Sequence, residues 1–142
     1  MKRMALIGAF VAGFLSTLIF HQGLLEIFYI LDLSTHAPYS TKATAPFLVP
    51  QVISLAFWGG IWGVPLWFII RHLSKINFWL MALVFGALAP SMIAWFVVFP
   101  LKGLPVAGGW KPMVIMVSLI INGVWGLGTA LLMKIFTVNH ES

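Results

Sequence analysis

Charged residues are scarce in this sequence and cysteine is absent. Only 8% of the 142 residues are charged and 61% are hydrophobic, whereas a soluble domain carries about 25% charged residues. So few charges cannot cover a water-exposed surface, and the composition predicts lipid around most of the chain. The absence of cysteine excludes disulfides, thiolate metal sites and redox dithiols. We expect a single integral membrane domain over residues 1–142.

Acidic residues are the rarest charged type, with three Asp and Glu against eight Lys and Arg and a net charge of +5. In a soluble protein this balance would suggest nucleic acid as a partner. Here the basic residues fall at the ends of apolar runs, which is where membrane topology places them. We therefore expect a lipid bilayer as the partner and no nucleic acid.

Four apolar segments are long enough to cross a bilayer, which takes about 20 residues. They cover residues 4–25, 52–70, 78–99 and 113–133 to within a few positions, and they predict an all-α membrane protein with four transmembrane helices. The first segment follows a basic start, as a signal peptide would. A cleavage site needs small residues after the apolar core, but the chain continues with Phe20, His21 and Gln22. We expect this segment to stay uncleaved.

Glycine marks the middle of the second and fourth segments. Each contains a Gly-x-Trp-Gly unit, at residues 60–63 and 123–126. Small residues let helix backbones approach closely in lipid, so these units predict the packing centre of the bundle. The first and third segments carry four-residue stripes of mostly small residues, Ala5-Ala9-Gly13-Thr17-His21 and Ala82-Gly86-Pro90-Ala94. The glycines expected to pack helices are Gly13, Gly59, Gly60, Gly63, Gly86, Gly123 and Gly126.

The second and fourth segments cross in the same direction and resemble each other. A proline precedes each of them, Pro50 and Pro112, and the Gly-x-Trp-Gly unit follows about ten residues later. This pattern fits a tandem repeat of two helical hairpins, an arrangement found in some transporters. Two glycine-rich segments can also look alike by composition alone, and the sequence leaves both interpretations open.

Proline and tryptophan add two expectations. Pro65 and Pro90 lie inside apolar segments, and each removes a backbone hydrogen bond, so we expect the two helices to be broken or kinked there. Three tryptophans near segment ends fit an aromatic belt at the membrane surface, namely Trp67, Trp79 and Trp110. For the deeper ones the simpler account is packing beside glycine, and the alternative is that they line a ligand cavity; they are Trp58, Trp62, Trp95 and Trp125.

Three polar residues are candidates for a role inside or at the edge of the membrane, because an ionisable group in a span is by default a functional candidate. His21 lies close to the expected end of the first segment, where solvation at the membrane surface is the alternative explanation. Glu26 follows it and could equally be a solvated charge at a helix end. Asn122 lies about 14 Å along the helix from Met113, close to the bilayer centre, where a structural hydrogen bond between helices is the alternative.

No pattern indicates catalysis, a metal or a cofactor. The four histidines show no ligand spacing, and they are His21, His36, His72 and His140. His21 and Glu26 are five residues apart, about 140° around a helix, so they do not share a face. We expect no enzyme activity, no catalytic residues and no metal or cofactor site.

The distribution of basic residues predicts the orientation. With four spans, five basic residues fall on the side of the termini and three on the other. The first group is Lys2, Arg3, Arg71, Lys75 and Lys134, and the second is Lys42, Lys102 and Lys111. Basic residues are enriched in cytoplasmic loops, which places both termini in the cytoplasm.

Several short motifs together resemble a group of small bacterial inner-membrane proteins that carry no assigned function. The motifs are Phe57-Trp58-Gly59-Gly60-x-Trp62-Gly63, Pro100-Leu101-Lys102-Gly103, Gly108-Gly109-Trp110 and Asn122-Gly123-x-Trp125-Gly126. The resemblance covers most of the chain. It implies a multi-pass protein of the bacterial inner membrane and lends no active site.

Two functional hypotheses follow. The first is a small ion or solute channel, or a transporter subunit, suggested by Asn122 near the midplane, by Pro65 and Pro90, and by His21 near one mouth. The second is a structural or assembly subunit that packs against other membrane proteins or against a second copy. The small-residue stripe from Ala5 to Thr17 suggests it, because such stripes form helix contacts in lipid.

Overall fold

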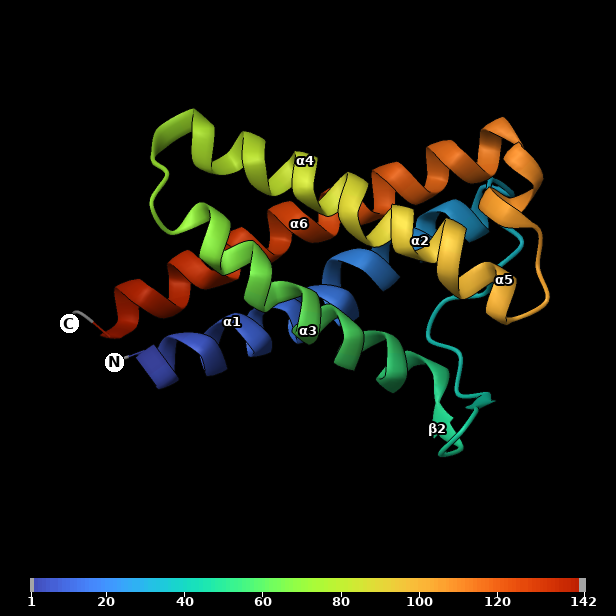
Figure 1. Ribbon diagram of the computed structural model, residues 1–142, viewed down its shortest axis with the longest axis horizontal. Coiled ribbons are helices and arrows are strands. Elements are labelled where there is room, and N and C mark those ends of the chain that lie inside the picture. Colours follow the sequence, from blue (N-terminus) through green and yellow to red (C-terminus); the bar gives the residue numbers. More distant parts are fainter. Residues whose placement is uncertain (1, 141–142) are drawn as a thin grey trace.

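Four long helices make up the fold of this computed structural model, which describes residues 2–140 (Figure 1). The first helix joins α1 (Lys2–Ser16), the π-helical turn η1 (Thr17–His21) and α2 (Gln22–Ile30); the second is α3 (Gln51–Ile70). The third joins α4 (Lys75–Ile93), the π-helical turn η2 (Ala94–Val98) and α5 (Phe99–Leu101); the fourth is α6 (Pro112–His140). All four are long and apolar enough to cross a membrane. The helical prediction is confirmed, and the first helix extends past the predicted membrane span of residues 4–25 to Ile30.

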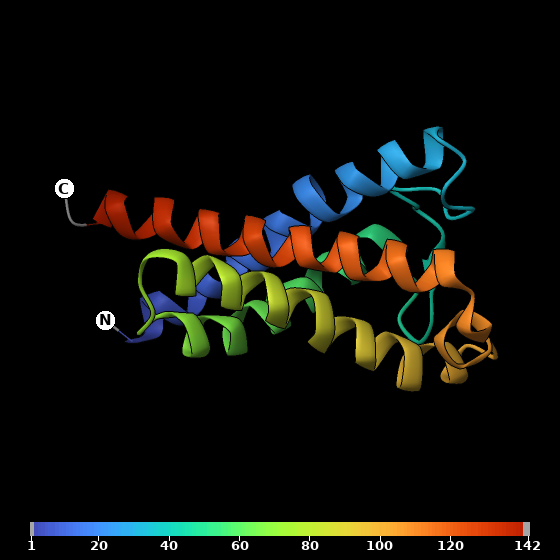
Figure 2. The ribbon, with the colours of Figure 1, turned by 90° about the horizontal axis from the view of Figure 1, so that it is seen from above.

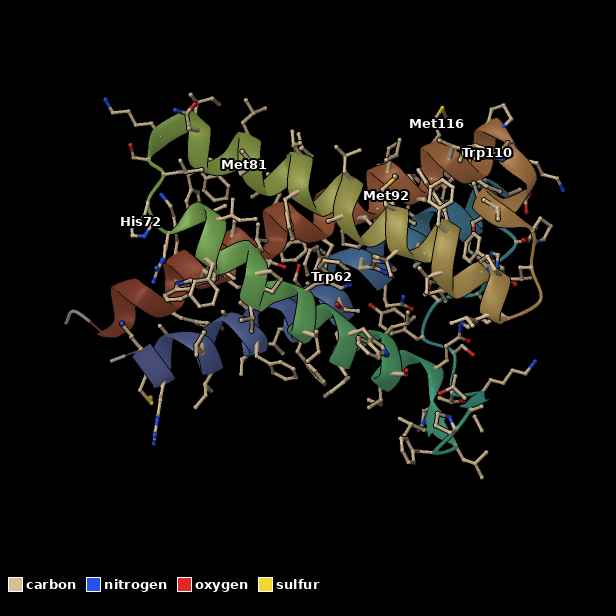
Figure 3. All side chains as sticks on the ribbon, viewed as in Figure 1. Trp62, His72, Met81, Met92, Trp110 and Met116 are labelled. Atoms are coloured by element: carbon tan, nitrogen blue, oxygen red, sulfur yellow. The ribbon has the colours of Figure 1, made fainter. Side chains whose placement is uncertain are left out.

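Both described ends of the chain lie at the same end of the bundle, beside the turn between α3 and α4 (Figure 1). Figure 3 shows His72 of that turn at this end and Trp110 at the opposite end. The opposite end holds the two longer connections. One contains a small antiparallel ribbon of β1 (Ala43–Thr44) and β2 (Val49–Pro50), and the other contains the 3-10 turn η3 (Val106–Trp110).

The first hairpin is formed by α1 and α3, which cross where both helices carry small residues. A methyl group added at Gly13 would overlap the carbonyl oxygen of Gly59. One added at Gly63 would lie 2.5 Å from the carbonyl oxygen of Ala9. The two backbones are therefore in direct contact, and only glycine fits at these positions.

The second hairpin, α4 with α6, crosses in the same manner. A methyl group added at Gly86 would lie 2.7 Å from the carbonyl oxygen of Asn122. One added at Gly126 would overlap the carbonyl oxygen of Ala82. All seven glycines expected to pack helices are buried and lie against a neighbouring helix, although Gly60 and Gly123 meet side chains, those of Phe10 and Leu83, rather than backbone.

The two hairpins join through α1 and α6. Trp125 Nε1 donates a hydrogen bond of 3.1 Å to the carbonyl oxygen of Gly13, and Ser16 Oγ donates one of 2.8 Å to the carbonyl oxygen of Trp125. Gly128 adds a close approach to the ring of Phe20 that was not foreseen. The two Gly-x-Trp-Gly units thus do not pack mainly on each other, because each one serves the crossing of its own hairpin.

The helix breaks that were one of the two expectations at the prolines do not occur. α3 runs through Pro65 and α4 runs through Pro90 without interruption. A proline removes only one donor and leaves the rest of the hydrogen-bond ladder intact. The irregularities are instead the π-helical turns η1 and η2, one in each hairpin.

Apolar side chains cover the outside of the bundle. Large exposed examples include Ile7, Leu83, Met92 and Ile120. Trp58 is 56% exposed, so it faces outward and does not fill space beside the glycines as predicted. Trp125 and Trp95 are buried, at 3% and 6% exposure, and Trp62 packs edge-on against Phe85 with ring centroids 6.0 Å apart.

Candidate functional site

Four polar side chains meet between the helices, and we call them the polar network: His21, Gln22, Ser91 and Asn122. Gln22 Nε2 lies 3.1 Å from His21 Nδ1, and Asn122 Nδ2 donates to Ser91 Oγ over 2.8 Å. The side chains of His21 and Asn122 are also hydrogen-bonded to each other. The first helix, α4 and α6 thus each contribute to one continuous set of hydrogen bonds.

The π-helical turns help to bring these residues together. A π-helical turn inserts an extra residue into an α-helix and shifts the face that follows it, and such turns are frequent at functional sites. His21 ends η1 and Gln22 follows it, while Ser91 lies just before η2. Neither turn could be predicted from the sequence, because both consist of residues that also suit an ordinary helix.

The donors and acceptors of the polar network have a fixed order. The Tyr39 backbone N–H donates to Gln22 Oε1 over 2.7 Å, so the amide group of Gln22 must present its Nε2 to His21. An amide nitrogen only donates, and therefore His21 Nδ1 accepts and the neutral ring carries its proton on Nε2. Because Asn122 directs Nδ2 at Ser91, its Oδ1 is the atom that accepts from His21.

This order makes the polar network a poor proton wire. His21 is the only member that takes up a proton readily, and it has a carboxamide on each side. If Nδ1 of His21 were protonated, its N–H would face the N–H of Gln22 Nε2, and two donors cannot form a hydrogen bond. The Gln22 amide would then have to rotate, and its Oε1 would lose the hydrogen bond from the Tyr39 N–H. The network therefore couples the charge of His21 to the position of the connection between α2 and α3.

That connection is held to the first helix at two points. Besides the Gln22 bond, the Tyr39 hydroxyl donates to the carbonyl oxygen of Leu18 over 2.7 Å. Gln22 is only 1% exposed, so its amide lies in the interior of the protein. In Figure 2, α2 diverges from α6 toward the end of the bundle that holds the connection between α2 and α3.

Trp95 follows Ser91 of the polar network by four positions on the third helix and has an unusual feature. Its side chain is 6% exposed and its Nε1 is a buried donor without a partner among the described side chains. Other buried hydroxyls at the helix contacts are satisfied by backbone carbonyls, as Thr17 by that of Gly13 and Thr129 by that of Trp125. An unsatisfied buried donor in a folded protein calls for an explanation.

Two of the three polar candidates from the sequence belong to the polar network, and the third does not. His21 and Asn122 lie together, although nothing in the sequence pattern pairs them. Glu26 is exposed on α2 and takes no part in the polar network. Gln22 and Ser91 were missed as site residues, because serine and glutamine in an apolar helix have no signature until their neighbours are known.

Metal chemistry has no support in the part of the chain whose side chains are described. No group of three or more His, Cys, Asp or Glu residues lies close enough there to hold a metal ion. The polar network offers neutral donors and acceptors of hydrogen bonds.

No protein-family model, curated protein or solved structure matches this chain. The chemistry of the polar network and the surface of the bundle are therefore the grounds on which a function can be assigned.

Proposed function

We propose that this chain is an integral protein of the bacterial inner membrane and that it is a channel or transporter subunit for a small polar solute. Its membrane location is supported by four helices of sufficient length and hydropathy and by the exposed apolar side chains around them. Outward-facing leucine, isoleucine and tryptophan at this density would aggregate in water but suit lipid.

The orientation that we propose has both termini in the cytoplasm. Two basic residues at that end lie over aromatic rings: Arg71 is 4.7 Å from the ring centroid of Trp67, and Lys134 is 4.6 Å from that of Phe78. Cation–π contacts of this kind suit the membrane surface, where aromatic rings and basic side chains gather. With Lys2, Arg3 and Lys75, these residues outnumber the basic residues of the other end.

The observation that carries the transport proposal is the polar network itself. His21, Ser91 and Asn122 lie between apolar helices, where polar side chains are costly and tend to mark the path of a solute. Asn122 is about 15 Å along α6 from Pro112, and so about halfway across a hydrocarbon core of about 30 Å. A site at mid-depth is where transporters bind their substrates.

The tandem repeat is part of this proposal. In the first hairpin Gly59 faces Thr17, and in the second Asn122 faces Ser91. The second hairpin thus carries an amide side chain where the first has a glycine. Two related hairpins, one closely packed and one bearing polar groups, would give a bundle with a single site.

Solute uptake by vesicles tests the proposal. Purified protein in phosphatidylethanolamine/phosphatidylglycerol vesicles should pass at least one member of a panel of small ions and neutral solutes faster than empty vesicles do. Asn122→Leu should slow this flux, because it removes the amide that links His21 to Ser91. Ser118→Ala is the matched control, since the Ser118 hydroxyl donates only within α6, to Val114. No flux above that of empty vesicles across the panel would reject the proposal.

The alternative of an assembly subunit has lost the observation that suggested it. The stripe through Ala9, Gly13 and Thr17 is covered by α3 of the same chain, at Gly59 and Gly63. It is therefore not free to bind another membrane protein or a second copy.

A further inference from the structure

One buried side-chain atom of the described residues has no hydrogen-bond partner at all, and it is a donor on the third helix. Gln22 Oε1 is occupied by the Tyr39 N–H, His21 Nδ1 by Gln22, and Ser91 Oγ by Asn122. Trp95 Nε1, in contrast, is a buried donor with no partner in the described part of the chain. An indole N–H can only donate, so a group that satisfies it must bring an acceptor.

Trp95 and Ser91 lie on the same face of the third helix. Four residues separate them, which is close to one full turn in an α-helix or a π-helix. Both are buried, at 6% and 0% exposure, whereas Met92 is 47% exposed and lies on the outside of α4 (Figure 3). The Ser91 hydroxyl donates to the carbonyl oxygen of Ser118 at 3.5 Å, the limit of a hydrogen bond, and can turn toward a better acceptor.

The charges around this position favour an anion over a cation. Of the three acidic residues, Glu26 and Asp32 are exposed at the end of the first helix, and Glu141 lies outside the described residues. No carboxylate of the described residues takes part in the polar network, so a cation would find no counter-charge there. Basic residues lie at both ends of the bundle, and their potential acts strongly across a medium of low dielectric constant.

We infer that the site between the helices takes a small monovalent anion, which accepts hydrogen bonds from Trp95 Nε1 and from the Ser91 hydroxyl. This inference rests on the proposed transport function and names its substrate class. Halides, nitrate and formate have the size and the acceptor atoms for such a position.

Anion-specific flux measurements test the inference. Vesicles of phosphatidylethanolamine and phosphatidylglycerol that contain the protein should pass chloride, nitrate or formate and should exclude potassium. Trp95→Phe should raise the half-saturation concentration for the anion about tenfold or more, the effect of losing one hydrogen bond to a charged group. Trp58→Phe is the matched control, because the Trp58 indole is 56% exposed on the outside of α3, and it should change nothing.

The outcomes separate this inference from the transport proposal. Flux of glycerol or potassium without flux of anions would keep the transport proposal and overturn the anion site. Absence of flux for every solute would overturn both. If Trp95→Phe fails to fold, benzothienylalanine at position 95 keeps the shape of the side chain and lacks the N–H. An unchanged half-saturation concentration in that protein would overturn the role of Trp95.

Discussion

Trp125 on α6 donates its indole hydrogen bond to the backbone carbonyl of Gly13 on α1, over 3.1 Å. The same carbonyl accepts from Thr17 Oγ1 at 2.9 Å, and Gly13 also lies directly against Gly59 of α3. Three of the four helices therefore meet at one glycine. This point holds the two hairpins together a short distance along the first helix from the polar network.

Loss of the Trp125 hydrogen bond should weaken the joint between the hairpins. Trp125→Phe leaves the buried carbonyl with one donor fewer and a smaller ring in its place, so we expect the folded protein in detergent to lose about 1–3 kcal/mol of stability. Denaturant unfolding followed by circular dichroism measures this. Trp58→Phe, on the outside of α3, should cost much less, and equal losses in the two variants would contradict the role of the joint.

Gly13 itself should tolerate no side chain. Gly13→Ala places a methyl group onto the backbone of Gly59 and Gly60, which cannot move aside as a flexible side chain could. We expect a clear fall in the midpoint of thermal unfolding, since overpacking costs about 1–3 kcal/mol or more. Gly8→Ala is the control on the same helix, because nothing lies within 4 Å of the added methyl group there. A Gly13→Ala protein as stable as the Gly8→Ala protein would show that the helices do not cross here.

The Gln22 amide should determine the mobility of the connection between α2 and α3. Gln22→Leu removes the acceptor of the Tyr39 N–H, so hydrogen exchange at Tyr39 should become faster by about an order of magnitude for each 1.4 kcal/mol lost. Ser34→Ala is the control in the same connection, because the Ser34 hydroxyl accepts only from the exposed His36 N–H. Equal exchange at Tyr39 in the two variants would show that Gln22 does not hold it.

The absence of cysteine makes the orientation directly measurable. A single cysteine at Thr35 or at Ser74, both exposed, would be the only thiol in the protein. An impermeant maleimide added to intact cells should label Thr35→Cys, whereas Ser74→Cys should react only after the membrane is opened. Labelling of both positions from outside would contradict the four-span topology, and the reverse pattern would invert the orientation.

The architecture was accessible from the sequence because it depends on residues that are close together in the chain. Apolar length predicts a span, and the four-residue spacing of Ala9, Gly13 and Thr17 predicts a face for close packing. Hydrogen bonds between distant segments leave no such pattern. Asn122 and Ser91 are 31 positions apart, and their pairing depends on how two helices cross.

The irregular parts of the helices were harder to predict from the sequence, for a different reason. The π-helical turns arise from local adjustments of the backbone, and no residue type marks them as glycine marks a close approach. The prolines predict helix breaks that do not occur, since α3 continues through Pro65 and α4 continues through Pro90. Without η1 and η2, neither the direction of His21 nor the burial of Trp95 could be foreseen.

The most direct test of the polar network is the protonation of His21 in a bilayer. Solid-state NMR of protein labelled with ¹⁵N-histidine reports which ring nitrogen carries the proton, and His21→Phe identifies the resonances among the four histidines of the sequence. The hydrogen bonds of Gln22 and Asn122 predict a neutral ring protonated on Nε2, with Nδ1 as an acceptor. A ring protonated on Nδ1 would contradict the network and the site built on it.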